Sequence, residues 1–172
     1  TGWGGAIYQR GKITNLYNNI FRNNKAVTGG AIYHRVNTIT NIYNNIFLGN
    51  SPEAIFNRLD VGVNLYNVYN NIFAFHTLAI NDDNTTTMAK YYNNTFVENT
   101  TAMDIEGSTF TENYNAFWSN DTNCSGQACG TTDVNFTAFP FVGLNGDLNF
   151  AVKESQISII DGKGTNLNVD NK

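Results

Sequence analysis

Two short blocks of this sequence return at regular intervals along most of its length. The block Gly-Gly-Ala-Ile-Tyr at residues 4–8 returns at 29–33, and Tyr-Asn-Asn-Ile-Phe at 17–21 returns at 43–47, at 69–73 and, with Thr for Ile, at 92–96. Alanines at positions 6, 31, 54, 79 and 102 are spaced by 25, 23, 25 and 23 residues. A period in this range is typical of solenoids, in which each unit buries its apolar face only against its neighbours. The sequence therefore predicts a stack of repeated coils.

Three short β-favouring segments can be recognised within one repeat. In residues 4–28 they are 6–9, 13–17 and 19–21, and corners rich in Gly, Lys or Asn separate them. Strands this short fit triangular coils whose strands pair in parallel with the coils above and below, whereas the Asn, Thr and Gly content argues against helices. We expect an all-β parallel β-helix, a single-stranded solenoid of about five coils over 1–120, rising roughly 24 Å at ~4.8 Å per coil. An irregular loop and capping segment should follow over 121–172.

Stacking turns each repeated position into a row of like residues along the axis. Like side chains then pack on each other between coils about 4.8 Å apart. We expect three such apolar rows to form the core: Ile7, Ile32, Ile55, Ile80 and Met103; Leu16, Ile42, Val68 and Tyr91; Phe21, Phe47, Phe73 and Phe96.

Asparagine occurs 30 times in the chain, and two of its repeated sets lie at expected corners. The first set follows the second strand of each repeat and consists of Asn18, Asn44, Asn70 and Asn93. The second set follows a Phe by three positions and consists of Asn24, Asn50, Asn99 and Asn120. Asn tolerates a left-handed backbone, and its amide can bond to the Asn one coil away. Both sets are therefore predicted to form hydrogen-bonded rows, with Asn70 buried. His76 takes the slot after Phe73 and is interpreted as a satisfied corner histidine.

The two repeated motifs resemble a known family. Gly-Gly-Ala-Ile together with Phe-x-x-Asn, at 21–24, 47–50, 96–99, 110–113 and 117–120, resembles the paired motif of the polymorphic outer-membrane protein repeats and, more broadly, right-handed parallel β-helix surface proteins. The far end of the chain is similar to the closing segment of bacterial and archaeal secreted β-helix proteins. The similarity lies in residues 139–142 and 145–148, and then in Ile160-Asp161 and Gly164. Phe139 stands where that pattern has Asp, and 158–159 is Ser-Ile in place of Pro-Ala. The resemblance implies right-handed coils and a place at the cell surface.

Composition restricts the classes of partner. Only 14% of the 172 residues are charged and the formal net charge is −4, so long-range attraction of nucleic acid is not expected. No run of about 18 apolar residues is present to span a bilayer. The chain opens at Thr1 without a charged or apolar leader, as expected for a mature or trimmed soluble chain.

Cys124 and Cys129 lie in a Gly/Ser/Thr-rich stretch that can close a short loop. A disulfide outside the coils is the expected use, with two free thiols as the alternative; the spacing does not fit a zinc or redox motif. Six Asn-x-Ser/Thr triplets are possible N-glycosylation sites: Asn84, Asn93, Asn99, Asn120, Asn123 and Asn135. Both features favour an extracellular or cell-surface location.

Acidic residues are too scattered to predict a catalytic centre. An inverting glycosidase needs two carboxylates that face each other, and a polysaccharide lyase needs an acidic calcium cluster beside a basic residue. The first two repeats contain no acid, and acids of the later repeats lie on different segments, among them Asp60, Asp82, Asp83, Asp104, Glu106 and Glu112. Asp82-Asp83 is interpreted as an acidic turn rather than a calcium site. We therefore assign no catalytic residue, metal ligand or cofactor.

One surface constellation is a candidate binding site. Three arginines lie four residues after the repeat alanine: Arg10, Arg35 and Arg58. Three aromatic residues lie two residues after it: Tyr8, Tyr33 and Phe56. If the isoleucines beside the rings point inward, strand alternation sends the rings outward. The stripe is then either a solvated face, in which Arg stacks on Tyr and Asp60 relieves the repulsion, or a platform for an acidic or neutral glycan.

The sequence best fits a non-enzymatic extracellular module of a surface adhesin, sheath or filament. A carbohydrate-active enzyme or glycan-binding module on the same fold is the alternative. The first coil, which begins at Gly4, would present unpaired strand edges and a slice of the core. We therefore expect residues 1–28 to be covered, either by upstream coils or by a second subunit stacked end to end.

Overall fold

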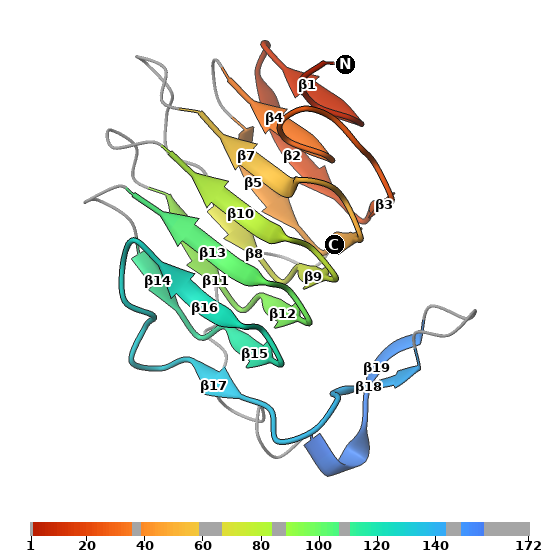
Figure 1. Ribbon diagram of the computed structural model, residues 1–172, viewed down its shortest axis with the longest axis vertical. Helices are drawn as coiled ribbons and strands as arrows, with labels where there is room; N and C mark the ends of the chain where they lie inside the picture. The colour runs from red at the N-terminus through yellow and green to blue at the C-terminus, as the bar shows by residue number, and fades with distance from the viewer. Residues whose placement is uncertain are drawn as a thin grey trace.

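The structure is a computed structural model that describes residues 2–35, 39–58, 67–83, 89–106, 111–143 and 149–156. Almost all of its regular structure is β-strand (Figure 1), apart from one helical turn at 154–156. The strands are β1 (Ile7–Gln9), β2 (Ile13–Tyr17), β3 (Ile20–Arg22), β4 (Ile32–His34), β5 (Ile39–Tyr43), β6 (Ile46–Leu48), β7 (Glu53–Asn57), β8 (Asn67–Tyr69), β9 (Ile72–Ala74), β10 (Leu78–Asp82), β11 (Lys90–Tyr92), β12 (Thr95–Val97), β13 (Thr101–Ile105), β14 (Thr111–Asn113), β15 (Ala116–Trp118), β16 (Thr122–Ser125), β17 (Val134–Asn135), β18 (Phe141–Gly143) and β19 (Asn149–Val152).

Three parallel sheets run along the stack of coils. The first sheet has the order β1-β4-β7-β10-β13-β16, the second β2-β5-β8-β11-β14, and the third β3-β6-β9-β12-β15-β17. Three consecutive strands, one from each sheet, make one coil, and the next coil pairs with it in parallel. The described part of the chain contains five such triplets, from β1–β3 to β13–β15. From the first triplet to the last, the chain makes a β-solenoid of about 4 turns. The predicted all-β parallel solenoid is confirmed.

Positive φ angles and close backbone approach explain the repeated corner residues. Asn18, Asn44 and Asn70 have φ angles of 53° to 56° between the second and third strands of their coils, which Asn tolerates better than most residues. Gly4 has a φ of 67°. At the following glycine, a Cβ on Gly5 would lie 2.1 Å from the carbonyl oxygen of Gly30, so only glycine lets these two coils pack. The Gly-Gly pair is thus required by geometry.

The three predicted apolar rows form one core inside the coils. Register pairs the isoleucines of the first row with one another and then with Met103. The phenylalanine rings stack from Phe21 to Phe117, with centroids 4.7 to 5.4 Å apart. Such ring pairs contribute roughly 0.5–1.5 kcal/mol each beyond their burial. The rows therefore form the core, and the rings stack at about the separation that backbone hydrogen bonds give to paired strands.

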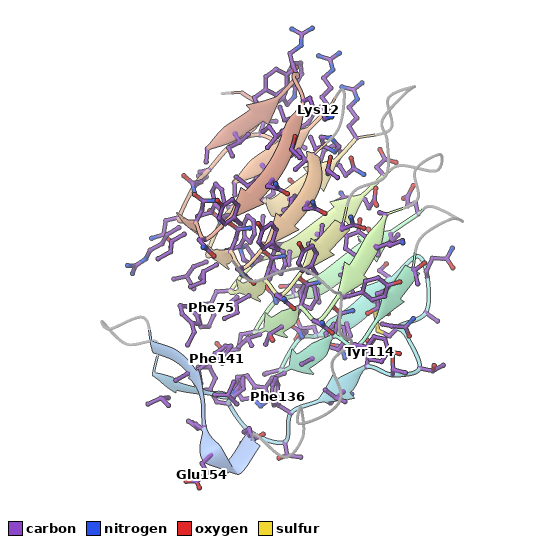
Figure 2. The ribbon with its side chains drawn as sticks, turned by 180° about the vertical axis from the view of Figure 1, so that it is seen from behind. Lys12, Phe75, Tyr114, Phe136, Phe141 and Glu154 are labelled. Carbon is purple, nitrogen blue, oxygen red and sulfur yellow. A yellow bond between two sulfur atoms is a disulfide. The ribbon has the colours of Figure 1, made fainter. Side chains whose placement is uncertain are left out.

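The C-terminal part continues the solenoid and then covers one of its faces. β16 pairs with β13 and β17 pairs with β15, so parallel pairing extends beyond residue 120; the division into 1–120 and 121–172 stays a prediction. β18 and β19 form an antiparallel pair. Phe141 packs on Leu48, Ala74 and Val97 outside the main core (Figure 2), so this segment covers part of the third sheet. The predicted closing residues at 145–148, 158–161 and 164 lie outside the described residues.

Candidate functional site

The outer face of the first sheet brings most of the predicted stripe together. Tyr8, Tyr33 and Phe56 are register partners on successive coils, and the isoleucines beside them belong to the core. Nη1 of Arg35 donates to Tyr8 Oη at 2.9 Å, and Nη1 of Arg58 donates to Tyr33 Oη at 3.0 Å. Each of these guanidinium groups is therefore held against a ring hydroxyl one coil nearer the N-terminus.

Trp3 completes this surface, although the sequence analysis did not select it. Its ring stacks on Tyr33 with centroids 5.8 Å apart, and Arg35 lies 5.7 Å from the centroid of the Trp3 ring. Phe56 stacks on Tyr33 as well, at 5.4 Å. Tyr33 is only 2% exposed as a result, whereas Trp3 is 49% exposed. Tyr33 therefore has no face left for a sugar. Trp3, which stands outside the repeat pattern, is the most exposed ring of this surface, and Tyr8 and Phe56 are half-buried.

The charges on this face change sign along the axis. Backbone hydrogen bonds across successive coils place five residues in one line, which we call the charge row: Arg10, Arg35, Arg58, Asp83 and Glu106. In the line beside it, Phe56 is followed by Asn81 and then by Asp104. The first three coils therefore carry arginines and rings, while the next two carry carboxylates and an amide.

Asparagine amides join the coils, but one row is shifted by a residue from its predicted place. Asn70 is exposed and only turns the chain. The amides that bond from coil to coil belong to the residues that follow the corners: Asn19, Asn45, Asn71, Asn94 and Asn115. Nδ2 of Asn45 donates to Asn71 Oδ1 at 3.1 Å and to the carbonyl oxygen of Leu16 at 2.8 Å. The prediction of a buried Asn70 is wrong because the left-handed residue points outward and the next side chain returns to the interior.

The second predicted row is confirmed, and a histidine takes one place in it. It consists of Asn24, Asn50, His76, Asn99 and Asn120. Nε2 of His76 lies 3.3 Å from Asn50 Nδ2, and its Nδ1 lies 3.0 Å from Asn99 Oδ1. Because an amide nitrogen only donates, the network assigns the proton to Nδ1. Burial lowers the pKa of His76 to about 4, so the ring is neutral.

A polar column inside the first sheet escaped the sequence analysis. His34 Nδ1 lies 2.7 Å from Asn57 Oδ1, Asn57 Nδ2 donates to Asp82 Oδ1 at 2.6 Å, and Tyr91 Oη donates to Asp82 Oδ2 at 2.5 Å. Gln9 begins this column, and all four strand residues are buried. The interpretation of Asp82 as part of a turn is wrong, because it lies in β10. The available signal was a polar residue two places after each isoleucine of the first row, where strand alternation points inward.

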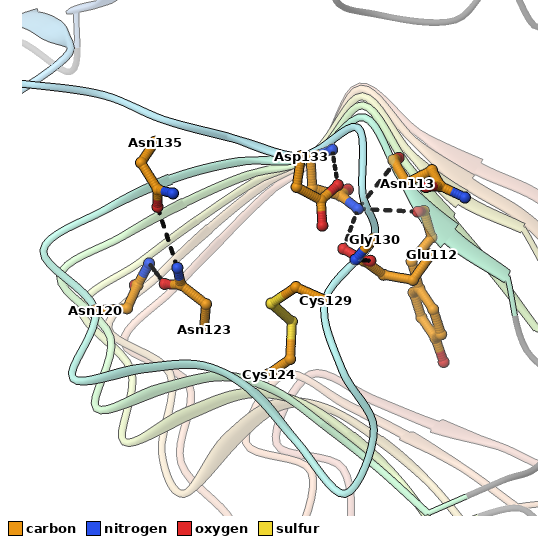
Figure 3. Close-up of a disulfide and its surroundings, with 11 residues drawn as sticks. Glu112, Asn113, Asn120, Asn123, Cys124, Cys129, Gly130, Asp133 and Asn135 are labelled. Atoms are coloured by element: carbon orange, nitrogen blue, oxygen red, sulfur yellow. Dashed lines mark hydrogen bonds between the residues drawn. A yellow bond between two sulfur atoms is a disulfide. The ribbon is translucent and has the colours of Figure 1, made fainter.

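The predicted disulfide between Cys124 and Cys129 is present, and it closes the C-terminal end of the core. Cys124 is the register partner of Met103, and both cysteines pack against the main core. Figure 3 shows the bridge within the outline of the coils. The expected position outside the coils is therefore wrong, since Cys124 continues the isoleucine row by one coil.

A buried carboxyl group lies next to this disulfide. Oε1 of Glu112 accepts from Asn115 Nδ2 at 2.7 Å, and its Oε2 accepts from the backbone N–H of Gly130 (Figure 3). Asp133 Oδ1 accepts from the backbone N–H of Asn115 at 2.8 Å and so ends the first asparagine row. Burial, together with Asp133, raises the pKa of Glu112 to about 8. Among the described residues, no group of three or more His, Cys, Asp or Glu is arranged to hold a metal ion.

The possible glycosylation sites differ in access. Asn84 lies outside the described residues, and Asn135 is exposed. Asn99 is 2% exposed, and its Nδ2 donates to Asn120 Oδ1 within the second row, so it cannot carry a glycan in the folded chain. Asn93, Asn120 and Asn123 are half-buried.

Comparison of the chain with protein-family models, curated proteins and solved structures gave no match. Within the described ranges, no helix is long and apolar enough to cross a membrane. The fold and its surfaces are therefore interpreted from the geometry of this chain.

Proposed function

We propose that this chain is a non-enzymatic extracellular module, structural or adhesive, of a cell-surface protein, sheath or filament. The observation that carries the proposal is the continuity of the two asparagine rows, which link each of the five coils to the next. Buried amides that satisfy one another fix the register between coils, and stacked rings fill the space between them. A stack held in this way is suited to serve as a stiff spacer.

The proposed setting is supported by the disulfide and by the roles of the repeated motifs. Disulfides persist in oxidising compartments such as the cell exterior. In the first coil, the motifs that resemble polymorphic outer-membrane protein repeats have physical roles. The Gly-Gly pair makes a close corner, Phe21 belongs to the aromatic row, and Asn24 belongs to the second amide row. These roles support membership of that group of surface β-helices.

The N-terminal end of the stack supports attachment of a further coil. β1, β2 and β3 are edge strands of their sheets. Trp3, Tyr17, Ile20 and Val27 are 49% to 63% exposed around this end. Exposed edges and apolar side chains favour pairing with another strand. We propose that a further β-coil, from preceding sequence or from a second copy, covers residues 1–28.

An activity screen and hydrogen exchange test the proposed function. Incubation of the purified chain with neutral and acidic polysaccharides should release neither reducing ends nor unsaturated uronates, while a polysaccharide lyase in the same assay gives the positive signal. Release of either product by the chain would overturn the non-enzymatic assignment. Backbone amides from β4 to β15 should exchange as one protected block, because the rows join these coils. Independent exchange of neighbouring coils would contradict a stiff spacer.

A glycan-binding module is the second candidate, and the exposed Trp3 beside Arg35 favours it. A ring face takes the apolar face of a sugar, and a guanidinium takes a carboxylate or sulfate. If the stripe binds glycan, Trp3→Ala should abolish retardation in affinity electrophoresis through an acidic polysaccharide. Phe75→Ala is the matched control, because Phe75 is 40% exposed and follows β9 in the third sheet. Equal retardation of both variants and of the parent would exclude this surface as the site.

A further inference from the structure

The charge row indicates a partner that carries the opposite sequence of charges along its axis. Arg10, Arg35 and Arg58 occupy the first three coils, and Asp83 and Glu106 occupy the next two. Arg10 and Glu106 at its ends are exposed, and the three residues between them are half-buried. Asp104 adds a third carboxylate to the acidic part of the face. The first sheet therefore presents one basic part and one acidic part to a neighbouring molecule.

This pattern is complementary to a second copy of itself in one orientation. Side-by-side copies with parallel axes would set arginine against arginine, and like charges in contact disfavour a complex strongly. Two copies that face each other across a twofold axis parallel to the sheet and perpendicular to the stack, at the level between Arg58 and Asp83, meet with their charges in opposite order. This axis sets Arg58 against the partner's Asp83 and Arg35 against the partner's Glu106, because successive coils are equally spaced. Every contact in such a twofold arrangement occurs twice.

We propose that the first-sheet faces of two copies pair with antiparallel axes, so that Arg35 and Arg58 of one copy bind the partner's Glu106 and the partner's Asp83. A guanidinium has five N–H donors, so Arg35 and Arg58 can keep the contacts that they make within their own chain, including the bonds to Tyr8 and Tyr33, and still donate to a carboxylate of the partner. The tyrosine hydroxyls hold both guanidinium groups against the sheet, which reduces the entropy lost when they bind. The pairing is independent of the proposed spacer function.

The association should be reversible and sensitive to salt. Ion pairs near a surface are weak one by one and are screened by salt. Sedimentation of the whole chain at low salt, over a concentration series, should show a monomer–dimer equilibrium that shifts to monomer as salt is added. A chain that stays monomeric at low salt and millimolar concentration would overturn the proposal.

Charge reversal tests the predicted contacts directly. Arg35→Glu and Glu106→Arg should each weaken dimerisation by about tenfold or more, because each places like charges together twice per dimer. An equimolar mixture of the two variants should recover the affinity of the parent, since each introduced charge then faces an opposite one. A mixture that associates no better than its components would overturn the proposal.

Lys12→Glu is the matched control. It changes the net charge by the same amount as Arg35→Glu, but Lys12 is exposed beyond the charge row, at the first coil (Figure 2). Its dimerisation should equal that of the parent. Because Arg35 also contacts Trp3 and Tyr8, a second mixture of Arg58→Glu with Asp83→Arg repeats the test without altering Arg35. Recovery in both mixtures, with no effect of Lys12→Glu, supports the antiparallel pairing.

Discussion

Nδ1 of His76 lies 3.0 Å from Oδ1 of Asn99, in a row where the other coils present asparagine amides. On its other side, Nε2 of His76 faces the donating Nδ2 of Asn50 at 3.3 Å. The neutral ring replaces an asparagine because it offers one donor and one acceptor. A second proton on Nε2 would set two donors against each other.

Because a histidine occupies this place in the asparagine row, the stability of the folded chain should depend on pH. The pKa of His76 is lowered from 6.5 to about 4 by burial, so at pH values between these the unfolded chain binds a proton that the native chain does not. Stability should therefore fall as the pH falls through this window, by up to about 3 kcal/mol. His76→Asn should remove this loss and complete the amide row. Urea unfolding of both proteins at pH 7 and pH 4.5 measures the difference, and equal losses would contradict it.

Asn71 should be more sensitive to substitution than its neighbour Asn70. Asn71→Ala leaves the partners of a buried amide unsatisfied, at a cost of about 1–3 kcal/mol. Asn70→Gly is the control, since glycine accepts the φ of 55° at this exposed corner and should change stability little. Chemical denaturation gives both values. Equal effects would mean that the amide row contributes nothing beyond the turn.

Glu112 should produce a pH dependence of the opposite sign. Its pKa is raised from 4.5 to about 8, so the native chain holds a proton that the unfolded chain releases between these values. Stability from this group is fully present below pH 4.5 and is lost as the pH rises through about 8. Glu112→Gln keeps an acceptor for Asn115 and removes the titration, so it should abolish the loss of stability between pH 4.5 and about 8. Urea unfolding across this range measures the loss. An equal loss in the parent and the variant would show that Glu112 is ionised at neutral pH.

The disulfide should stabilise the last coil more than the first. Its cysteines are 5 residues apart, and closing so short a loop contributes about 2 kcal/mol in the chain-entropy model. Reduction, or a Cys124→Ala/Cys129→Ala double variant, should raise hydrogen exchange in β13 and β16 while β4 keeps its protection. Uniform loss of protection over all coils would instead show that the bridge supports the whole stack. Alkylation without reductant should label neither cysteine of the parent.

Much of the fold follows from sequence period alone. The spacing of Ala6, Ala31 and Ala54 predicts the coils, and like residues at equivalent positions predict the Ile and Phe rows, because parallel pairing in register brings equivalent residues together. The asparagines after Phe21 and Phe47 were found in the same way. The period also explains the error at Asn70. The repeat shows that an Asn-Asn pair forms each corner, but both asparagines of the pair recur with the same period. Only the left-handed backbone angle of the first asparagine decides that its side chain turns outward.

The sequence by itself determined the stack of coils and its core rows, because these depend on side chains that recur with the period. It also led us to expect the bond between Cys124 and Cys129, because the two cysteines are close in sequence. The tertiary structure alone decided what the non-repeating residues do. Trp3 covers Tyr33, Asp82 enters a buried column with Tyr91, and Cys124 closes the core instead of a surface loop. The contacts of Trp3 with Tyr33 and of Asp82 with Tyr91 join positions that the period does not relate, and they form only where the coils bring separate segments within a few ångströms of each other.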